Sequence, residues 1–140
     1  MADVFFDTNI LLYLLSGDAA KASRAEELLA SRGVVSVQVL NEFVAVASRK
    51  LALEFAGIRE ILATVRALCA VQPVDIGTHE LGLDLAERHH FSIYDALIVA
   101  AALRARCTVL YTEDLPHNQK IERLKIQNPF HPLSKNDQPA

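Results

Sequence analysis

Short apolar segments alternate with longer amphipathic segments along the chain, and this alternation predicts strands separated by helices. Strands are predicted where β-branched and aromatic residues cluster, at Val4 to Phe6, Val34 to Val37, Val71 to Ile76, Thr108 to Tyr111 and Leu124 to Ile126. Pro73 makes the third of these an edge or connecting strand, because proline cannot donate to a central ladder. Strands joined by helical crossovers are usually parallel, so we expect an α/β fold around a mostly parallel sheet.

Helices are predicted where apolar residues recur three and four positions apart. They cover approximately residues 10–15, 19–31, 38–51, 54–69, 78–90 and 96–103. Thr8 or Asn9 is available to cap the first of these helices, and Thr78 is expected to cap the fifth. The last, from Ala96 to Leu103, is almost wholly apolar, so other elements must surround it.

Length and composition indicate one domain. The chain has 140 residues, of which 51% are hydrophobic, and this is enough for one continuous core. We expect a domain over residues 1–130 and a polar tail over residues 131–140. No segment approaches the roughly 20 apolar residues that cross a membrane, and the N-terminus lacks the pattern of a secretion signal. The expected location is the cytoplasm, with Cys69 and Cys107 as reduced packing residues.

Four acidic residues stand where strands end or helices begin. Asp7 follows the first strand, and Glu42 borders the apolar stripe of its helix. Asp95 lies at the start of the apolar helix, and Asp114 follows the fourth strand. Ligand sites of open α/β sheets lie at the carboxyl ends of the strands, so we expect these four acids to converge there.

Each of these acids also has an ordinary structural interpretation. Asp7 can serve a turn or a helix start, and Glu42 can simply solvate its carboxylate. Asp95 has the spacing of a capping box with Ser92, and Asp114 can belong to a turn. The functional interpretation therefore depends on the four acids taken together.

A cluster of carboxylates requires a cation. At an effective dielectric constant near 20, two unit negative charges about 4 Å apart repel by ~4 kcal/mol. Oxygen ligands without a Cys or His set suit Mg²⁺ or Mn²⁺, and His79, His89 and His90 do not have the spacing of such a set. A divalent cation of this kind can activate water, polarise a phosphorus centre and stabilise a leaving oxygen.

The charge of the chain is compatible with a nucleic-acid substrate. The formal net charge of −3 argues mildly against a surface based on bulk positive charge. Setting aside four metal-bound carboxylates changes this charge to +1. Phosphate contacts could then come from Arg49, Lys50, Lys120, Arg123 and Lys125. For any one of these residues taken alone, an ordinary solvated surface is the favoured interpretation.

The sequence resembles PIN-domain nucleases and, more narrowly, the VapC-type toxins of toxin-antitoxin pairs. The resemblance spans about Asp3 to Asn128. Its motifs are Asp7-Thr8-Asn9, Glu42, the segment from Ser92 to Ile98, and the segment from Thr112 to Leu115. It implies a single three-layer α/β/α domain with a mostly parallel sheet of about five strands. It also implies a homodimer and a small antitoxin that occludes the site.

The resemblance further implies roles for individual residues. Asp7, Glu42, Asp95 and Asp114 would be the catalytic acids. Asp7 and Asp95 would hold the metal ion directly, with Glu42 and Asp114 as further candidate ligands. Glu113 lies next to Asp114, so the sequence leaves open which of these two acids points into the site. The supporting polar residues would be Thr8, Asn9 and Thr112.

The resulting hypothesis is a Mg²⁺- or Mn²⁺-dependent endoribonuclease that cleaves cellular RNA as the toxin of a toxin-antitoxin pair. Two alternatives stay open. One is a PIN-type nuclease that processes RNA or single-stranded DNA without a toxin role, and the other is an RNA-binding module without catalysis. A phosphoaspartyl phosphatase is disfavoured, because Asp7 lacks a second aspartate two residues later.

Overall fold

Six short strands form one sheet within residues 3–130, the part of the chain that this computed structural model describes. The predicted tail, residues 131–140, lies outside the described residues. The strands are β1 (Val4–Phe6), β2 (Gly33–Ser36), β3 (Cys69–Gln72), β4 (Val109–Tyr111), β5 (Lys120–Ile121) and β6 (Leu124–Gln127). Their order across the sheet is β3-β2-β1-β4-β6-β5.

The sheet is mostly parallel, as predicted. Only β5 runs antiparallel, and it pairs with β6. The sequence predicted about five strands, and β5 is the strand that was not predicted. Its two residues are too few to produce a hydrophobic pattern. β3 is an edge strand, as predicted, but it spans Cys69–Gln72 and ends immediately before Pro73 instead of continuing to Ile76.

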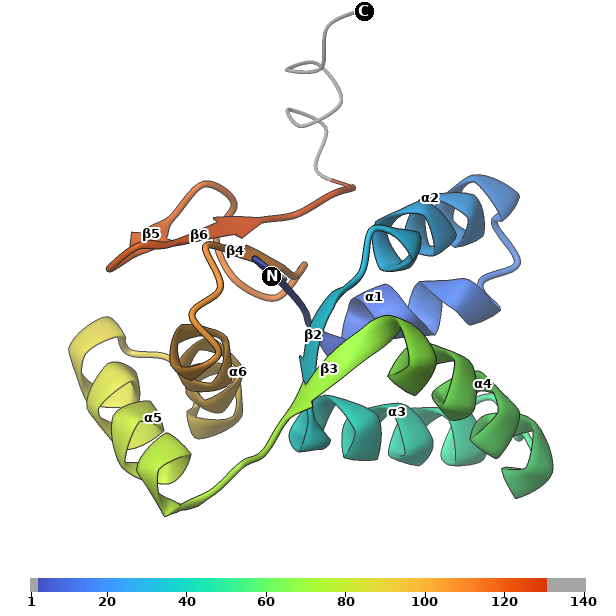
Figure 1. The fold of residues 1–140 in the computed structure, drawn as a ribbon, viewed down its shortest axis with the longest axis horizontal. Helices are drawn as coiled ribbons and strands as arrows, with labels where there is room; N and C mark the ends of the chain where they lie inside the picture. Colours follow the sequence, from blue (N-terminus) through green and yellow to red (C-terminus); the bar gives the residue numbers. More distant parts are fainter. Residues whose placement is uncertain (1–2, 131–140) are drawn as a thin grey trace, which may run out of the picture.

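Helices cover both sides of this sheet. They are α1 (Thr8–Leu12), α2 (Ala19–Ala30), α3 (Val37–Arg49), α4 (Phe55–Leu68), α5 (Ile76–His89) and α6 (Ile93–Arg104), with a 3-10 turn η1 (Tyr13–Leu15) after α1. Figure 1 shows α5 and α6 on one side of β1, β2 and β3, and α1 to α4 on the other side. The predicted three-layer arrangement is therefore confirmed.

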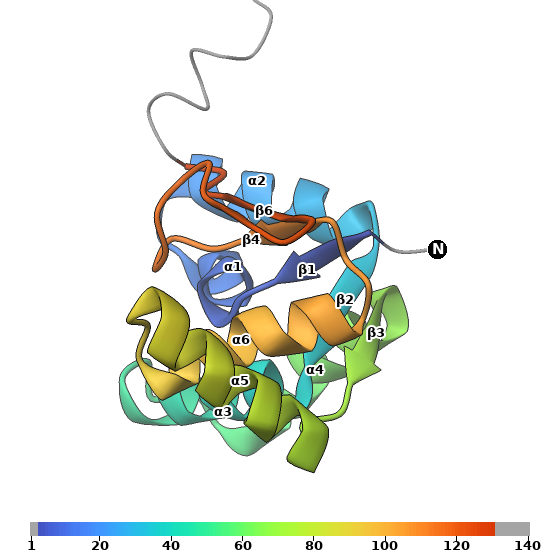
Figure 2. The same cartoon turned by 90° about the vertical axis from the view of Figure 1, so that its left-hand side faces the viewer.

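The apolar helix α6 is buried, as predicted. Its residues 98–103 are all buried, and Figure 2 shows α6 lying against the sheet with α5 packed beside it. Gly82 on α5 faces α6 closely: a Cβ atom there would lie 2.7 Å from Cδ2 of Leu97, so the end of this side chain would have to shift. This packing holds the N-terminal end of α6, with Asp95, at a defined place relative to the strand ends.

Two predicted helix caps are wrong. Asp7 caps α1 in place of Thr8 or Asn9, which agrees with its structural interpretation as a helix start, and its Oδ1 accepts a hydrogen bond from the backbone N–H of Thr8. Asp75, rather than Thr78, caps α5, and its Oδ1 accepts hydrogen bonds from both the N–H and the hydroxyl of Thr78. Aspartate is a better N-cap than threonine, so residue preference favours Asp75 over Thr78, in agreement with the structure.

Two further expectations concern the cysteines and the membrane. Cys69 and Cys107 are buried and free of disulfide bonds, as predicted. Cys69, however, begins β3 instead of ending the preceding helix. Within residues 3–130, no helix combines the length and apolar character needed to span a bilayer.

Candidate active site at the carboxyl edge of the sheet

Asp7 lies where β1 ends and α1 begins, with only 4% of its surface exposed. Both carboxylate oxygens accept hydrogen bonds: Oδ1 from the N–H of Thr8 at 2.6 Å, and Oδ2 from the hydroxyl of Thr112 at 2.7 Å. The backbone N–H of Asp7 donates to the carbonyl of Tyr111 at 3.0 Å. The end of β4 thus holds this acid in one orientation.

Burial raises the pKa of Asp7 to about 6. The hydrogen bonds from Thr112 and Thr8 act in the opposite direction, because they stabilise the charged form. The charges of Asp114 and Glu42 raise the pKa further. The ionised form of Asp7 is therefore unfavourable here, and a nearby cation would stabilise it.

Glu42 faces Asp7 from α3. Its Oε1 accepts a hydrogen bond from the hydroxyl of Thr8 at 2.7 Å, so Thr8 connects the two acids through its N–H and its hydroxyl. Its Oε2 accepts from Nε2 of Gln38 at 3.3 Å, and Gln38 also donates to the carbonyl of Tyr94 at 3.1 Å. The sequence predicted that Glu42 lies at the border of the apolar stripe of this helix, and its side chain is half-buried in the structure.

Asp95 occupies the first turn of α6. The hydroxyl of Ser92, the N-cap residue, accepts a hydrogen bond from the N–H of Asp95 at 3.1 Å. Burial raises the pKa of the Asp95 carboxyl, the Ser92 hydroxyl lowers it, and the charges of Asp114 and Glu42 raise it. Asp95 is thus part of a capped helix start and also close to the other acids.

Asp114 and Glu113 point to different partners. Asp114 Oδ2 accepts a hydrogen bond from Nδ2 of Asn9 at 3.3 Å, and its N–H donates to the hydroxyl of Thr112 at 3.0 Å. Glu113 Oε1 accepts from the hydroxyl of Tyr13 at 2.5 Å. The charge of Asp114 raises the pKa of both Asp7 and Asp95. Of the two neighbours, Asp114 is therefore the one directed to the acid cluster.

The structure brings all seven predicted site residues to one edge of the sheet. Glu42 and Asp114 both interact electrostatically with Asp7 and with Asp95, which places the four carboxylates in one neighbourhood. Sequence reasoning missed Gln38 and Tyr13. Gln38 precedes Glu42 by four residues on a helix, a spacing that could have indicated their contact. No pattern in the sequence indicates the contact of Tyr13. The supporting hydrogen bonds come from Thr8, Asn9 and Thr112.

The donor atoms of this site fit a hard divalent cation. They are oxygens, and Oδ1 of Asn9 is buried without a hydrogen-bond partner, so it is a further oxygen available to a ligand or to water. Within residues 3–130, no three Asp, Glu, His or Cys side chains are close enough together to hold one ion by themselves. Mg²⁺ typically keeps several waters and uses only one or two protein carboxylates, so it does not require a set of three such side chains.

Comparison with known proteins identifies the family. The model of the PIN domain matches residues 4–120, most of the chain, so the chain belongs to the PIN domain family. The predicted family is confirmed. No curated protein matches the chain.

The fold is similar to those of solved toxin structures. The VapC20 toxin of Mycobacterium tuberculosis, which cleaves the sarcin-ricin loop, is 23% identical with a TM-score of 0.64, over 79% of this chain and 89% of that chain. A toxin-antitoxin complex from Klebsiella pneumoniae is 22% identical with a TM-score of 0.69, over 91% and 98%. DNA-bound VapBC from Salmonella typhimurium is 23% identical with a TM-score of 0.62, over 91% and 98%. At these identities the similarity establishes the VapC-like fold.

Proposed function

We propose that this protein is an endoribonuclease that hydrolyses phosphodiester bonds with Mg²⁺ or Mn²⁺ and acts as the toxin of a toxin-antitoxin pair. The observation that carries the proposal is the cluster of four carboxylates at the strand ends, with Asp7 buried and its pKa raised to about 6. Such an arrangement is costly without a cation, and a surface that only binds RNA gains nothing from negative charge facing phosphate.

The residues of the cluster divide into two roles in this proposal. Asp7 and Asp95 hold the cation, which when bound supplies positive charge to polarise the phosphorus centre and stabilise the leaving oxygen. Glu42 and Asp114 complete the site and orient the attacking water by accepting hydrogen bonds from it. Their own positions are maintained by three polar side chains, Thr8, Asn9 and Thr112.

The substrate and the partner are proposed from the similar structures. VapC20 cleaves the sarcin-ricin loop, a structured RNA, and the other two structures are toxin-antitoxin assemblies. We therefore propose structured cellular RNA as the substrate and a small antitoxin that occludes the acid cluster. A homodimer in the cytoplasm is proposed from the resemblance of the sequence to VapC-type toxins.

Cleavage of structured RNA by the purified protein tests the nuclease. The assay compares Mg²⁺, Mn²⁺ and EDTA for the wild type and for Asp7→Asn and Asp95→Asn. Each substitution removes one ligand charge and keeps the volume of the side chain. We expect cleavage to fall by about 100-fold or more, on the scale of removing a principal electrostatic contact. Asp84→Asn, at an exposed position on α5, is the matched control. Unchanged cleavage by both site variants would exclude this mechanism.

Two further experiments test the toxin role and the target. A small upstream open reading frame with a DNA-binding N-terminus is expected beside the gene, and its co-expression should relieve growth arrest caused by the protein. Growth that is unaffected by the active nuclease would favour an RNA-processing enzyme without a toxin role. Sequencing of RNA ends after induced expression would identify the cleaved RNA.

A further inference from the structure

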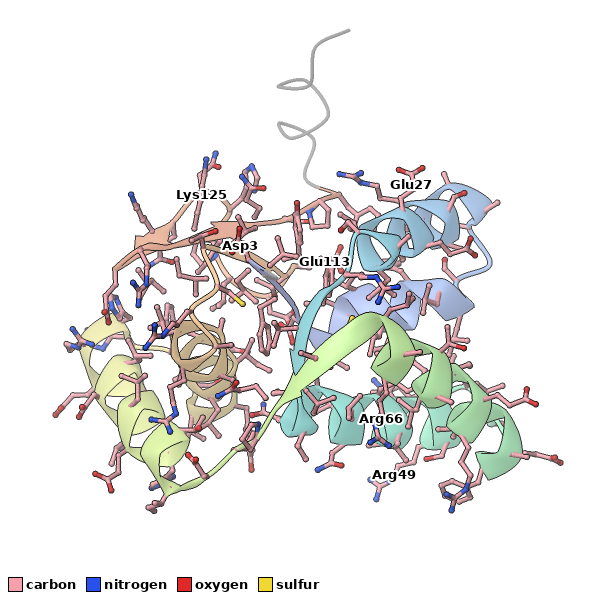
Figure 3. All side chains as sticks on the ribbon, in the orientation of Figure 1. Asp3, Glu27, Arg49, Arg66, Glu113 and Lys125 are labelled. Atoms are coloured by element: carbon pink, nitrogen blue, oxygen red, sulfur yellow. The ribbon has the colours of Figure 1, made fainter. Side chains whose placement is uncertain are left out.

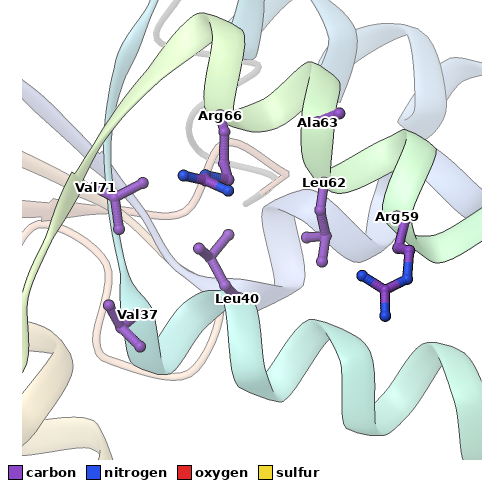
Figure 4. A pocket seen from close by; sticks show the side chains of 7 residues that line it. All are labelled: Val37, Leu40, Arg59, Leu62, Ala63, Arg66 and Val71. Carbon is purple, nitrogen blue, oxygen red and sulfur yellow. The ribbon is translucent and has the colours of Figure 1, made fainter. Parts of the chain in front are cut away.

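A recess lies outside the acid cluster, between α3 and α4 and next to β3. Its volume is about 440 Å³, which is large enough for several side chains of a bound segment. Figure 4 shows Leu40 of α3 and Leu62 of α4 pointing toward each other across it. The floor is aliphatic and includes Val37, Leu40, Leu62 and Val71. Val37 is 40% exposed, so this floor is open to solvent.

Two arginines of α4 line the same recess. Arg59 and Arg66 are two helical turns apart, or about 10 Å along the axis. Both side chains are exposed, and neither forms an ion pair within residues 3–130, where the ion pairs are Arg24–Glu27 and Arg104–Asp75. Figure 3 shows Arg66 on the part of the molecule formed by α3 and α4, well away from Lys125 on β6.

This recess is separate from the acid cluster. Leu40 and Glu42 are two positions apart on α3, so their side chains lie on different faces of the helix. Glu42 is directed to Thr8 and Gln38, whereas Leu40 is directed to α4. A segment bound between α3 and α4 therefore leaves the carboxylates of the cluster accessible.

We propose that the recess between α3 and α4 docks a segment of a partner protein that carries an aliphatic stretch with carboxylates on both sides. The aliphatic floor matches Leu, Ile or Val side chains. The two unpaired guanidinium groups match carboxylates, which arginine can bind through two parallel hydrogen bonds. None of the lining residues is aromatic, so the recess lacks the ring faces on which the bases of single-stranded RNA stack.

Selection from a displayed library of random peptides, each of about 15 residues, tests this docking surface. We expect the selected peptides to combine acidic and aliphatic residues. We also expect the double variant Arg59→Glu with Arg66→Glu to bind them at least about tenfold more weakly, because like charges would then face each other. Peptides in which lysines replace the acidic residues should prefer the double variant. Arg88→Glu, an exposed arginine on α5, is the matched control.

The same variants distinguish a segment of a partner protein from two other possible occupants of the recess, an RNA strand and a second copy of this chain. Melting temperatures establish that the variants are folded, and RNA cleavage is expected to match that of the wild type in all of them. The proposal is overturned if no peptide is selected, or if the selected peptides bind wild type and double variant equally. It is equally overturned if the double variant instead loses binding to an RNA oligonucleotide, or if it shifts the monomer-dimer equilibrium in sedimentation.

Discussion

Thr112, the residue after β4, donates a 2.7 Å hydrogen bond to the carboxylate of Asp7, the residue after β1. The two residues are neighbours because β1 and β4 are parallel, with Phe6 paired to Tyr111. The same hydroxyl accepts a 3.0 Å hydrogen bond from the N–H of Asp114. One fully buried side chain therefore connects two acids of the proposed site.

Replacing Thr112 by valine should weaken both stability and cleavage. Valine preserves the volume but removes the hydroxyl, which leaves the N–H of Asp114 and one oxygen of Asp7 without this partner. The free energy of unfolding should fall by about 1–3 kcal/mol, and RNA cleavage by roughly tenfold. Thr112→Ser keeps the hydroxyl and should stay within a few-fold of wild-type cleavage. Denaturant unfolding and initial rates measure the two effects, and wild-type cleavage by Thr112→Val would contradict a role for this bond.

Without metal, Asp7 should make the protein less stable as the pH rises. Its pKa is raised from 3.8 to about 6, so the folded protein binds this proton more tightly than the unfolded chain does. The stabilisation from protonated Asp7 is complete below about pH 4 and is lost as the pH rises through about 6. The shift corresponds to about 3 kcal/mol.

The variant Asp7→Asn isolates this contribution, because asparagine does not titrate. In the presence of a chelator, the free energy of unfolding of wild type minus that of the variant should decrease by about 3 kcal/mol between about pH 3 and pH 8. A difference that stays constant with pH would show that the Asp7 carboxyl is not perturbed.

Divalent cations should stabilise the wild type at neutral pH. A ligand that binds only the folded state adds about 2.7 kcal/mol at one hundred times its Kd, and here it would also relieve repulsion between Asp7, Glu42 and Asp114. Thermal unfolding with Mg²⁺ or Mn²⁺ measures the gain, and NaCl at equal ionic strength is the control. Asp7→Asn should lose most of the gain. An equal shift in the variant would place the bound cation elsewhere.

Asp114 and Glu113 should differ in their importance for cleavage. Asp114→Asn removes a charge that acts on Asp7 and Asp95, and cleavage should fall by at least about tenfold. Glu113→Gln removes the charge of Glu113 but keeps an acceptor oxygen, and Tyr13→Phe removes the hydroxyl that donates to Glu113. Neither change touches the acid cluster, so both variants should remain within a few-fold of wild type. The reverse order of these rates would assign the catalytic role to Glu113.

Gly33→Ala should destabilise the sheet. A Cβ atom at Gly33 would lie 2.5 Å from Cε2 of Phe6 and 2.8 Å from the carbonyl oxygen of Val4. The carbonyl belongs to the β1 backbone, which cannot move freely, so overpacking should cost about 1–3 kcal/mol. The control is Gly57→Ala in α4, where no atom lies within 4 Å, and alanine should there add up to about 1 kcal/mol. Chemical denaturation of both variants provides the comparison, and equal stabilities would contradict the predicted clash.

Local pattern was sufficient for much of the fold. The apolar run in α6 predicted a buried helix, and Val4 to Phe6 followed by Asp7 predicted a strand that delivers an acid to the edge of the sheet. It was insufficient where neighbouring residues compete for one role. Asp75 and Thr78 both belong to the residue types that cap helices, and in the structure α5 begins at Ile76, which makes Asp75 its N-cap.

The sequence by itself determined the alternation of strands and helices, the buried faces and the set of acids, because these depend on side-chain type and on spacing along one segment. Tertiary structure alone decided that Asp114 turns to Asn9 while Glu113 turns to Tyr13, and that β5 joins the sheet. It also decided that Arg59 and Arg66, which form no ion pair within residues 3–130, border an aliphatic recess. These features arise from contacts between segments far apart in the chain, and the spacing within one segment carries no information about such contacts.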